Sequence, residues 1–397
     1  MKKLCSLLLF TCAVLTSGAQ IKVGQSVNNT PLVTVLNAPV KHTDLFSQKG
    51  KVVLIEFWAT WCGSCIEVMP HLQALQKQFG DKLQVITVST EQEKRIAQFI
   101  VNRPSNLWFA VDTADALRKD FPYHTIPHTI LIDPQGVVVA ISQPENITEK
   151  VIADVVAGLK ISLPLKEDNL SADPWKTYFS AKSEVQSRFL IQPQIAGLYS
   201  GSKTYGKAGG FSERRISIMN HTVEGMYRIA YGNFPSTRYI NLIPKEEKKE
   251  NEKMYCVDVI VPVGKESTLL PVFRAELKNR FDLQATVEKR LKTVYVLKIV
   301  NMDFIAKLVP SKFEKMEMTG RHGAFDGKRV TFSKIAGYLE DFGITGIPVV
   351  DETSNNKLYD ISFNYMPEKK GDYLEELRKL GLDLVKTERE IDMLIFK

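Results

Sequence analysis

Two cysteines three positions apart are the residues of this sequence that most directly imply chemistry. Cys62 and Cys65 lie in the segment Phe57–Cys65, which reads FWATWCGSC. Two thiols at this spacing can form a reversible disulfide or supply half of a zinc site. A zinc site would need a second such pair, and the sequence contains none. The pair therefore predicts thiol–disulfide exchange, with no metal and no cofactor beyond the disulfide itself.

The elements around the pair indicate which thiol reacts first. Lys51–Trp58 is a nearly continuous apolar run, typical of a strand buried on both faces. Cys62–Phe79 has apolar residues at helical spacing and is followed by Gly80, which predicts a helix and its end. The free N–H groups and the positive dipole at the helix start would stabilise a thiolate. We therefore expect Cys62 to be exposed and to attack first, and Cys65 to resolve the mixed disulfide.

One acidic residue in the buried strand is a candidate for moving the proton. Glu56 lies shortly before Cys62, in an otherwise apolar run. Burial favours the protonated carboxyl and raises its pKa, which suits a group that exchanges a proton with Cys65. The alternative is a Glu56 that is hydrogen-bonded locally and has no redox role.

The remainder of residues 20–160 predicts an α/β domain with a mixed sheet. Strands and helices alternate, and a hairpin around Pro134–Gly136 precedes the last helix. The expected strands are Leu83–Ser89, Leu107–Val111, Thr129–Asp133 and Val137–Ile141, and the expected helices are Glu91–Val101, Ala114–Asp120 and Ile147–Leu159.

The second half of the chain predicts a separate α+β domain. Residues 161–185 contain two prolines and mixed charges and indicate a linker, and Gly197–Gly210 indicates a glycine-rich loop. Residues 186–397 contain weakly repeated strand–helix–strand units whose strands alternate polar and apolar residues. The expected strands and helices of these units are Arg215–Asn220, Val223–Tyr231, Tyr239–Ile243, Tyr255–Val263, Leu269–Phe281, Leu283–Val287, Thr293–Val300, Arg329–Phe332, Ser333–Phe342, Pro348–Val350, Tyr359–Phe363, Tyr373–Leu380, Leu382–Lys386 and Ile391–Phe396.

The N-terminus predicts export. Met1–Ala19 has a lysine-rich start, an apolar stretch and a small-residue end, as a cleaved signal peptide does. A lipoprotein anchored through Cys12 is the alternative, although the residues before Cys12 are not the small pair that such anchors need. No later stretch reaches the ~20 apolar residues of a membrane span, so we expect a soluble periplasmic or secreted protein. Cys256, in an apolar strand, is expected to be a core residue.

The charge pattern argues against nucleic-acid binding. The net charge is +7, from 52 basic and 45 acidic residues. The basic run Lys245–Lys253 is interleaved with Glu, whereas a nucleic-acid site needs Lys and Arg clustered on one face.

Residues 22–160 resemble the TlpA/ResA branch of the thioredoxin superfamily. The resemblance is carried by Lys51–Pro70, with its Trp-Cys-x-x-Cys motif and a later helix proline, and by Ile126-Pro127 before the strand that begins at Thr129. It implies a thioredoxin-like fold and a cis bond before Pro127. It also implies that substrate contacts the residues flanking the disulfide and those of the cis-proline loop, namely Trp61, Gly63, Ser64, Ile126, Pro127 and His128.

Two positions depart from the family pattern. A Glu is common three residues after the second cysteine, but here that position is Val68 and the acid is Glu67, so its role is not transferred. His128 replaces the usual Thr after the cis-proline. With His124 and the thiols, His128 could bind a metal, but no further ligand has suitable spacing. Parts of the second half resemble an uncharacterised domain found after redoxin domains, which implies no activity.

Together these features predict an exported thiol–disulfide oxidoreductase. We expect a reductase that exchanges the Cys62–Cys65 pair with protein thiols and disulfides of the cell envelope and receives electrons from an upstream envelope donor. We expect residues 186–397 to be a docking module. The alternatives are a peroxiredoxin-like thiol peroxidase, whose Pro-x-x-x-Thr-x-x-Cys motif does not occur at Cys62, and a non-catalytic envelope docking protein.

Overall fold

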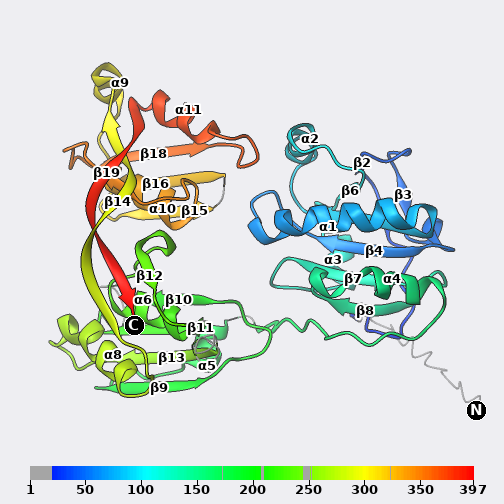
Figure 1. Ribbon diagram of the computed structural model, residues 1–397, viewed down its shortest axis with the longest axis horizontal. Coiled ribbons are helices and arrows are strands. Elements are labelled where there is room, and N and C mark those ends of the chain that lie inside the picture. The colour runs from blue at the N-terminus through cyan, green and yellow to red at the C-terminus, as the bar shows by residue number, and fades with distance from the viewer. Residues whose placement is uncertain (1–19, 172, 207–209, 245–250, 252, 322) are drawn as a thin grey trace, which may run out of the picture. The chain divides into compact units, whose positions relative to one another are not determined.

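The computed structural model describes residues 20–171, 173–206, 210–244, 251, 253–321 and 323–397 (Figure 1). The expected signal peptide, Met1–Ala19, therefore lies outside the described residues, as does most of the Glu-interleaved basic run. The chain divides into two compact units. Leu165 is the last residue of the first unit, and the chain from Lys166 to Lys397 lies in the second.

A mixed six-stranded sheet organises the first unit. Its strands run in the order β2-β6-β5-β4-β7-β8. The inner strands β4, β5 and β6 are parallel, whereas β2, β7 and β8 run antiparallel to their neighbours. The strand bounds are β2 Val35–Leu36, β4 Val52–Phe57, β5 Leu83–Ser89, β6 Trp108–Val111, β7 His128–Ile132 and β8 Val138–Ser142; β1 Pro31–Leu32 and β3 Thr43–Asp44 form a separate pair.

The helices of the first unit follow the strands, as the alternating pattern predicts. Every residue of β4 and β5 is buried, which explains why their sequences are mostly apolar. Pro70 lies inside α1, where it removes one backbone donor from the helix. The helix bounds are α1 Gly63–Phe79, α2 Glu93–Asn102, α3 Ala116–Asp120 and α4 Glu149–Val156.

Three further sheets organise the second unit. Their strand orders are β10-β11-β13-β9, β12-β19-β14-β17 and β15-β16-β18. The bounds are β9 Arg188–Pro193, β10 Gly201–Thr204, β11 Arg215–Thr222, β12 Tyr239–Asn241, β13 Met254–Ile260, β14 Ala285–Ile299, β15 Glu317–Arg321, β16 Ala324–Val330, β17 Val349–Asp351, β18 Tyr359–Asn364 and β19 Leu382–Phe396. The helices are α5 Pro174–Tyr178, α6 Val223–Ala230, α8 Leu269–Lys278, α9 Met302–Lys307, α10 Phe332–Asp341 and α11 Asp372–Lys379.

A long antiparallel ribbon joins the two cores of the second unit. Strands β14 and β19 pair along all 15 residues of each, from Ala285↔Phe396 to Ile299↔Leu382. One end of the ribbon packs with α6 and α8, and the other packs with α10 and α11. Figure 1 shows the ribbon curving between these two parts.

A buried carboxylate ties three neighbouring elements of the second unit together. Asp258 on β13 is fully buried and accepts hydrogen bonds from Arg188 on β9, at 2.7 Å, and from Arg215 on β11, at 2.9 Å. The Ser217 hydroxyl donates to the same carboxylate. The guanidinium groups of both arginines also donate to the carbonyl of Phe179, which follows α5.

The structure confirms the expected fold class, an α/β thioredoxin-like unit followed by a sheet-rich α+β unit. It changes three local expectations. The strands expected separately at 283–287 and 293–300 are one strand, β14, and those at 382–386 and 391–396 are one strand, β19. The expected linker contains α5 and the buried Phe179, so its second half belongs to the core of the second unit. The expected glycine-rich loop contains β10.

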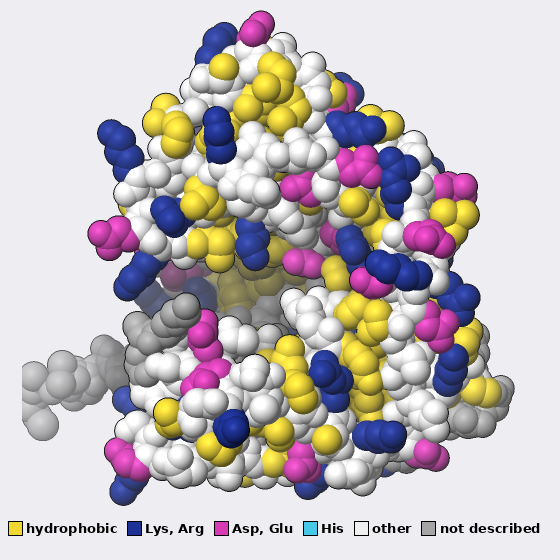
Figure 2. All heavy atoms as spheres, turned by 90° about the vertical axis from the view of Figure 1, so that its left-hand side faces the viewer, with side chains coloured by type: hydrophobic (Ala, Val, Ile, Leu, Met, Phe, Trp, Pro, Cys, Tyr) yellow, Lys and Arg dark blue, Asp and Glu magenta, His cyan; other side chains and the backbone are white. Residues whose placement is uncertain are grey.

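No helix among the described residues is both long and apolar enough to cross a membrane. Figure 2 shows a face on which Lys and Arg side chains are interspersed with Asp and Glu rather than gathered into a patch of one sign.

Candidate active site

The cysteine pair lies where the central strand β4 gives way to α1. Strand β4 ends at Phe57, and α1 begins at Gly63, directly after Cys62. The backbone N–H of Trp58 still donates to Val88 of the neighbouring strand, so the chain leaves the sheet only after this residue. The helix opens with a bond from the Ile66 N–H to the Cys62 carbonyl, which makes Cys62 the N-cap residue.

The sulfur of Cys62 takes the place of an N-cap acceptor. Cys62 and Cys65 form a disulfide, with a Cα–Cα distance of 5.3 Å. The backbone N–H of Cys65 donates to the Cys62 sulfur at 3.2 Å, and the Ser64 hydroxyl lies 3.6 Å from the same atom. An N-cap side chain normally accepts this bond through oxygen. Once the disulfide is reduced, the same donor and the helix dipole favour a thiolate at Cys62 over one at Cys65.

The two cysteines differ in accessibility, although less than the sequence predicts. Cys65 is fully buried, and Cys62 exposes 6% of its surface. The expectation of an exposed Cys62 is therefore wrong for the disulfide form, because its sulfur is bonded to that of the buried Cys65. Cys62 is nevertheless the more accessible of the two, as expected, because Cys65 has no exposed surface.

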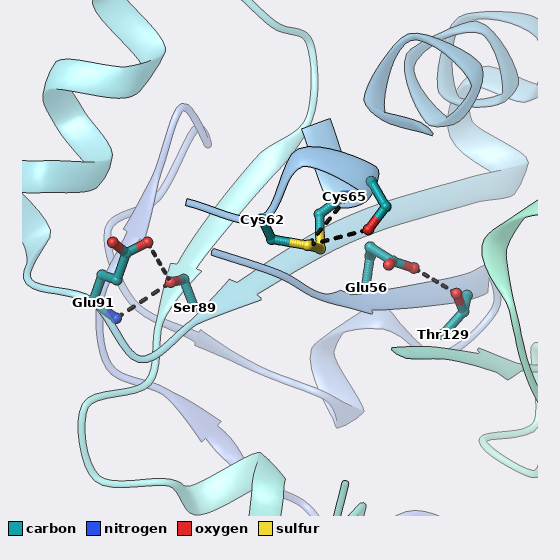
Figure 3. Close-up of a disulfide and its surroundings, with 7 residues drawn as sticks. Glu56, Cys62, Cys65, Ser89, Glu91 and Thr129 are labelled. Atoms are coloured by element: carbon teal, nitrogen blue, oxygen red, sulfur yellow. Dashed lines mark hydrogen bonds between the residues drawn. A yellow bond between two sulfur atoms is a disulfide. The ribbon is translucent and has the colours of Figure 1, made fainter. Parts of the chain in front are cut away.

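Glu56 lies on the same central strand, and its carboxyl is buried with 1% of the residue exposed. The hydroxyl of Thr129 on β7 donates to Glu56 Oε2 at 2.5 Å. The pairing of β4 with β7 places these two residues directly opposite each other. Figure 3 shows the Glu56 side chain below the disulfide, with its carboxyl turned toward Thr129.

The loop before β7 has the backbone geometry that the resemblance implies. The peptide bond between Ile126 and Pro127 is cis, as expected. Both residues are partly exposed. The next residue, His128, begins β7 and pairs with Phe57 at the end of β4.

The side chain of His128 faces an aromatic cluster. It is 3% exposed, and its ring centroid lies 5.4 Å from that of Tyr123 and 5.7 Å from that of Phe57. Burial raises the pKa of Tyr123 to about 12, so this phenol is neutral at ordinary pH. The expectation that the His128 side chain contacts substrate is not supported, because the ring is packed inside. A contact through its backbone remains compatible with the geometry.

The surface around the disulfide is formed by residues that flank the cysteines. Trp61 is 40% exposed, and Gly63 and Ser64 are also exposed. A side chain atom added at Gly63 would meet nothing within 4 Å. These three exposed residues are uncharged, and they lie next to the two cysteines in sequence.

Two residues near the disulfide were not predicted from the sequence. Thr129 was expected only as part of a strand, and its bond to Glu56 depends on the register of β4 and β7. Glu91 lies on the other side of the disulfide from Glu56, where its backbone N–H donates to the Ser89 hydroxyl at 3.2 Å (Figure 3). The Thr129 contact joins residues 73 positions apart and has no short-range sequence signal, whereas the Glu91 contact is a local turn of the kind that serine hydroxyls form.

The described residues offer no arrangement suited to a metal ion. No group of three or more His, Cys, Asp and Glu side chains among them converges as a ligand set. Of the two histidines considered as ligands, His124 is exposed and His128 is buried. Cys256 is a free, buried thiol that donates to the Asn220 side chain at 3.1 Å, as expected of a core cysteine.

Comparison with known proteins gives two family matches that together cover most of the chain. Residues 22–157 match the redoxin family. Residues 241–396 match a family described as a protein of unknown function, DUF3738.

Individual relatives match the first unit. The thioredoxin-like protein YneN of Bacillus subtilis is 31% identical over 122 residues, which are 30% of this chain and 69% of that protein. The thiol–disulfide oxidoreductase ResA of the same organism is 28% identical over 122 residues, or 30% of this chain and 68% of that protein. Among solved structures, the thioredoxin domain of a thiol–disulfide oxidoreductase from Bacteroides vulgatus is 25% identical, with a TM-score of 0.28; the match covers 36% of this chain and 98% of that one.

Proposed function

The chain belongs to the thioredoxin-like redoxins and is a thiol–disulfide oxidoreductase, and we propose that it is an exported reductase of protein disulfides. The observation that carries this proposal is the bond from the Cys65 N–H to the Cys62 sulfur at the start of α1. In the reduced protein this donor would stabilise the thiolate that attacks a client disulfide.

The first step of the proposed reaction is the attack of the Cys62 thiolate on one sulfur of a client disulfide. A new bond forms between Cys62 and that sulfur, and the other client sulfur leaves as a thiolate. Cys62 is suited to this step because it has exposed surface and the helix start favours its ionised form.

The second step releases the client. Cys65 loses its proton to Glu56, and its thiolate attacks the Cys62 sulfur of the mixed disulfide. The Cys62–Cys65 disulfide forms, the remaining client sulfur leaves as a thiolate, and two electrons have passed to the client. The burial of Glu56 beneath the disulfide supports its role as the proton acceptor.

The substrate surface in this proposal surrounds the disulfide. Trp61, Gly63 and Ser64 would contact the client on one side, and the cis-proline loop would contact its backbone on the other. From that loop we propose contacts with Ile126 and Pro127 and with the backbone of His128, since the imidazole of His128 is buried.

Export is proposed from the signal-like composition of Met1–Ala19. N-terminal sequencing of the protein from cell-envelope fractions tests this directly. A mature chain beginning at Gln20 is expected, and an uncleaved chain recovered from the cytoplasm would contradict export.

The direction of electron flow is tested by the reduction potential of the Cys62–Cys65 pair. Thioredoxin-fold proteins span roughly −270 to −120 mV, and a reductase should lie near the lower value. Equilibration with glutathione buffers, followed by alkylation and mass measurement, gives this potential. A value near the upper end would assign the protein to disulfide formation instead.

We also propose that the second unit, which contains residues 166–397, is a docking module that binds client proteins. Its three sheets end in the outer strands β9 and β10, β12 and β17, and β15 and β18. Such strands can accept an extended segment of a partner through backbone hydrogen bonds. Holding a client near Cys62 would raise its effective concentration without changing the chemistry.

A further inference from the structure

A row of polar residues crosses the buried central sheet in register. Thr87 on β5, Glu56 on β4, Thr129 on β7 and Ser142 on β8 are neighbours from strand to strand. Each is at most 1% exposed. Polar groups buried in this way need hydrogen-bond partners. The acceptor that each hydroxyl bonds to therefore indicates what that hydroxyl does in the sheet.

The three hydroxyls of this row have different partners. Thr87 donates to the Trp108 carbonyl at 3.1 Å, and Ser142 donates to the Pro164 carbonyl at 2.7 Å. Thr129 donates to the carboxyl of Glu56, at 2.5 Å. Hydroxyl bonds to an ionised carboxylate measure about 2.5–2.7 Å, so the Thr129 contact suits the ionised form of Glu56.

We propose that Thr129 is a positioning residue for the proton transfer between Cys65 and Glu56. Its hydroxyl holds one carboxyl oxygen of Glu56 and stabilises the ionised state that can accept a proton. The inference rests on the proposed role of Glu56. It adds that the Thr129 hydroxyl sets the pH range in which Glu56 is ionised and can accept the proton of Cys65.

Few other ionisable groups of the described residues lie around Glu56. Cys62 and Cys65 lie above it and titrate once the disulfide is reduced, and Glu91 lies beyond them (Figure 3). The His128 ring is on the opposite face of β7, because successive strand residues alternate. The remaining titratable side chains of α1, and of α4, which contacts β4, are exposed or bonded elsewhere: Glu67, His71, Lys77, Glu149, Lys150 and Asp154.

The proton and electrons balance in the step that Thr129 supports. The Cys65 S–H bond breaks, and its proton passes to Glu56 Oε1 or Oε2. The Cys65 electron pair forms the bond to the Cys62 sulfur, and the client sulfur leaves with the electron pair of the mixed disulfide. The protonated Glu56 then returns its proton to solvent or to the departing thiolate. Thr129 stays bonded to the carboxyl and exchanges no atoms.

Removing the Thr129 hydroxyl should shift the pH profile of the second step. Without its donor the ionised carboxylate of Glu56 loses a hydrogen bond, so the carboxyl would keep its proton to higher pH. A hydrogen bond to a charged group corresponds to a shift of about one to two pH units. Thr129→Val should therefore slow the second step near neutral pH and restore it at higher pH, while Thr129→Ser should keep the original profile.

The test is a stopped-flow measurement on the reduced full-length protein with a chromogenic aromatic disulfide, from pH 5 to pH 9. The first aromatic thiolate released reports the attack by Cys62, and the second reports the attack by Cys65. Thr87→Val is the matched control, because Thr87 borders Glu56 on the other side but bonds to a carbonyl. Thr129→Val should move only the second phase to higher pH, and Thr87→Val should move neither.

The outcomes separate this inference from the proposed function. In the Glu56→Gln background, Thr129→Val should cause no further shift, because its effect acts through the carboxyl. If Glu56→Gln slows the second phase but Thr129→Val leaves its pH profile in place, the role of Thr129 is wrong and that of Glu56 stands. If Glu56→Gln leaves both phases unchanged, the proton-transfer role fails and this inference fails with it. Equal shifts in Thr87→Val and Thr129→Val would assign the effect to sheet packing.

Discussion

At the scale of single residues, the chemistry follows from where two sulfur atoms lie relative to one helix. Cys62 is the N-cap of α1 and receives the Cys65 N–H, whereas Cys65 is inside the first turn and fully buried. The same two residue types thus have unequal tendencies to ionise. The inequality supports the order that we propose for the reaction, in which the more ionised and more accessible thiol, Cys62, attacks first.

Cys256 provides a contrast with the reactive pair. It is fully buried in the second unit, and burial raises the pKa of its thiol. Little thiolate therefore exists at Cys256 at neutral pH, and reagents cannot reach it. After mild reduction of the native protein, iodoacetamide should label Cys62, the cysteine with exposed surface, but not Cys256. Mass spectrometry of peptides checks this, and unfolding in guanidinium should expose Cys256 to the reagent. Rapid labelling of Cys256 in the native protein would contradict the burial that we describe.

The candidate site residues carry local signals in the sequence, whereas the residues packed around them do not. The Cys-x-x-Cys spacing, the buried run that contains Glu56 and the Ile126-Pro127 loop are local signals, and the structure places all of them at one end of β4. The hydroxyl of Thr129 could not be assigned, because its contact with Glu56 depends on strand register across 73 positions of sequence. The burial of the His128 ring likewise follows from its packing against Tyr123, a tertiary contact.

At the scale of elements, prediction succeeded where an element is stabilised by its own pattern and failed where a distant partner stabilises it. The buried strand β5 was expected with its observed bounds. In contrast, β14 and β19 were each expected as two strands, since the polar segments 288–292 and 386–390 interrupt their apolar patterns. Each strand continues through its polar segment because the other supplies a continuous ladder of backbone partners.

The buried Asp258 carboxylate should be a major stabilising feature of the second unit. Asp258→Asn would leave Arg188 and Arg215 without their counter-charge in a buried site, which typically costs about 3–5 kcal/mol. Hydrogen-exchange mass spectrometry should show lost protection in β9, β11 and β13 and unchanged protection in β4 and β5.

The matched control for this prediction is Asp392→Asn. Asp392 pairs with Lys289 at 3.0 Å, but its side chain is 52% exposed. Exposed pairs of this kind contribute about 0–1 kcal/mol, so this variant should behave like the wild type. Equal losses of protection in the two variants would show that the Asp258 carboxylate stabilises the second unit no more than an exposed ion pair does.

At the scale of the whole molecule, the redox site lies within the redoxin match, whereas the proposed docking strands all lie after it. The redoxin match ends at residue 157, and the match of unknown function begins at residue 241. Between them, α5, β9, β10, β11 and α6 form part of the second unit. The division suggests an experiment in which chemistry and client choice are measured separately.

Truncation after Leu165 should separate these two properties. The six-stranded sheet and the core around Phe57 and Phe121 lie before this point, so we expect the shortened protein to fold. Its reduction of insulin should be nearly unchanged, because that assay needs only the disulfide site. The set of clients captured in cells should shrink, because the docking surfaces are gone. Capture of the same clients at the same yield would reject the docking role. Loss of insulin reduction by a folded truncation would mean that the second unit completes the active site.

The central claim, that Cys62 attacks and Cys65 resolves, is tested most directly by trapping mixed disulfides in cells. Cys65→Ser removes the thiol that releases the client, so this variant should accumulate covalent complexes that disappear on reduction with dithiothreitol. Cys62→Ser removes the attacking thiol, and the buried Cys65 should form few such complexes. Full-length variants are compared at equal abundance on non-reducing gels. Abundant complexes with Cys65→Ser and few with Cys62→Ser are the result that we predict, and equal trapping by both variants, or by neither, would contradict the account.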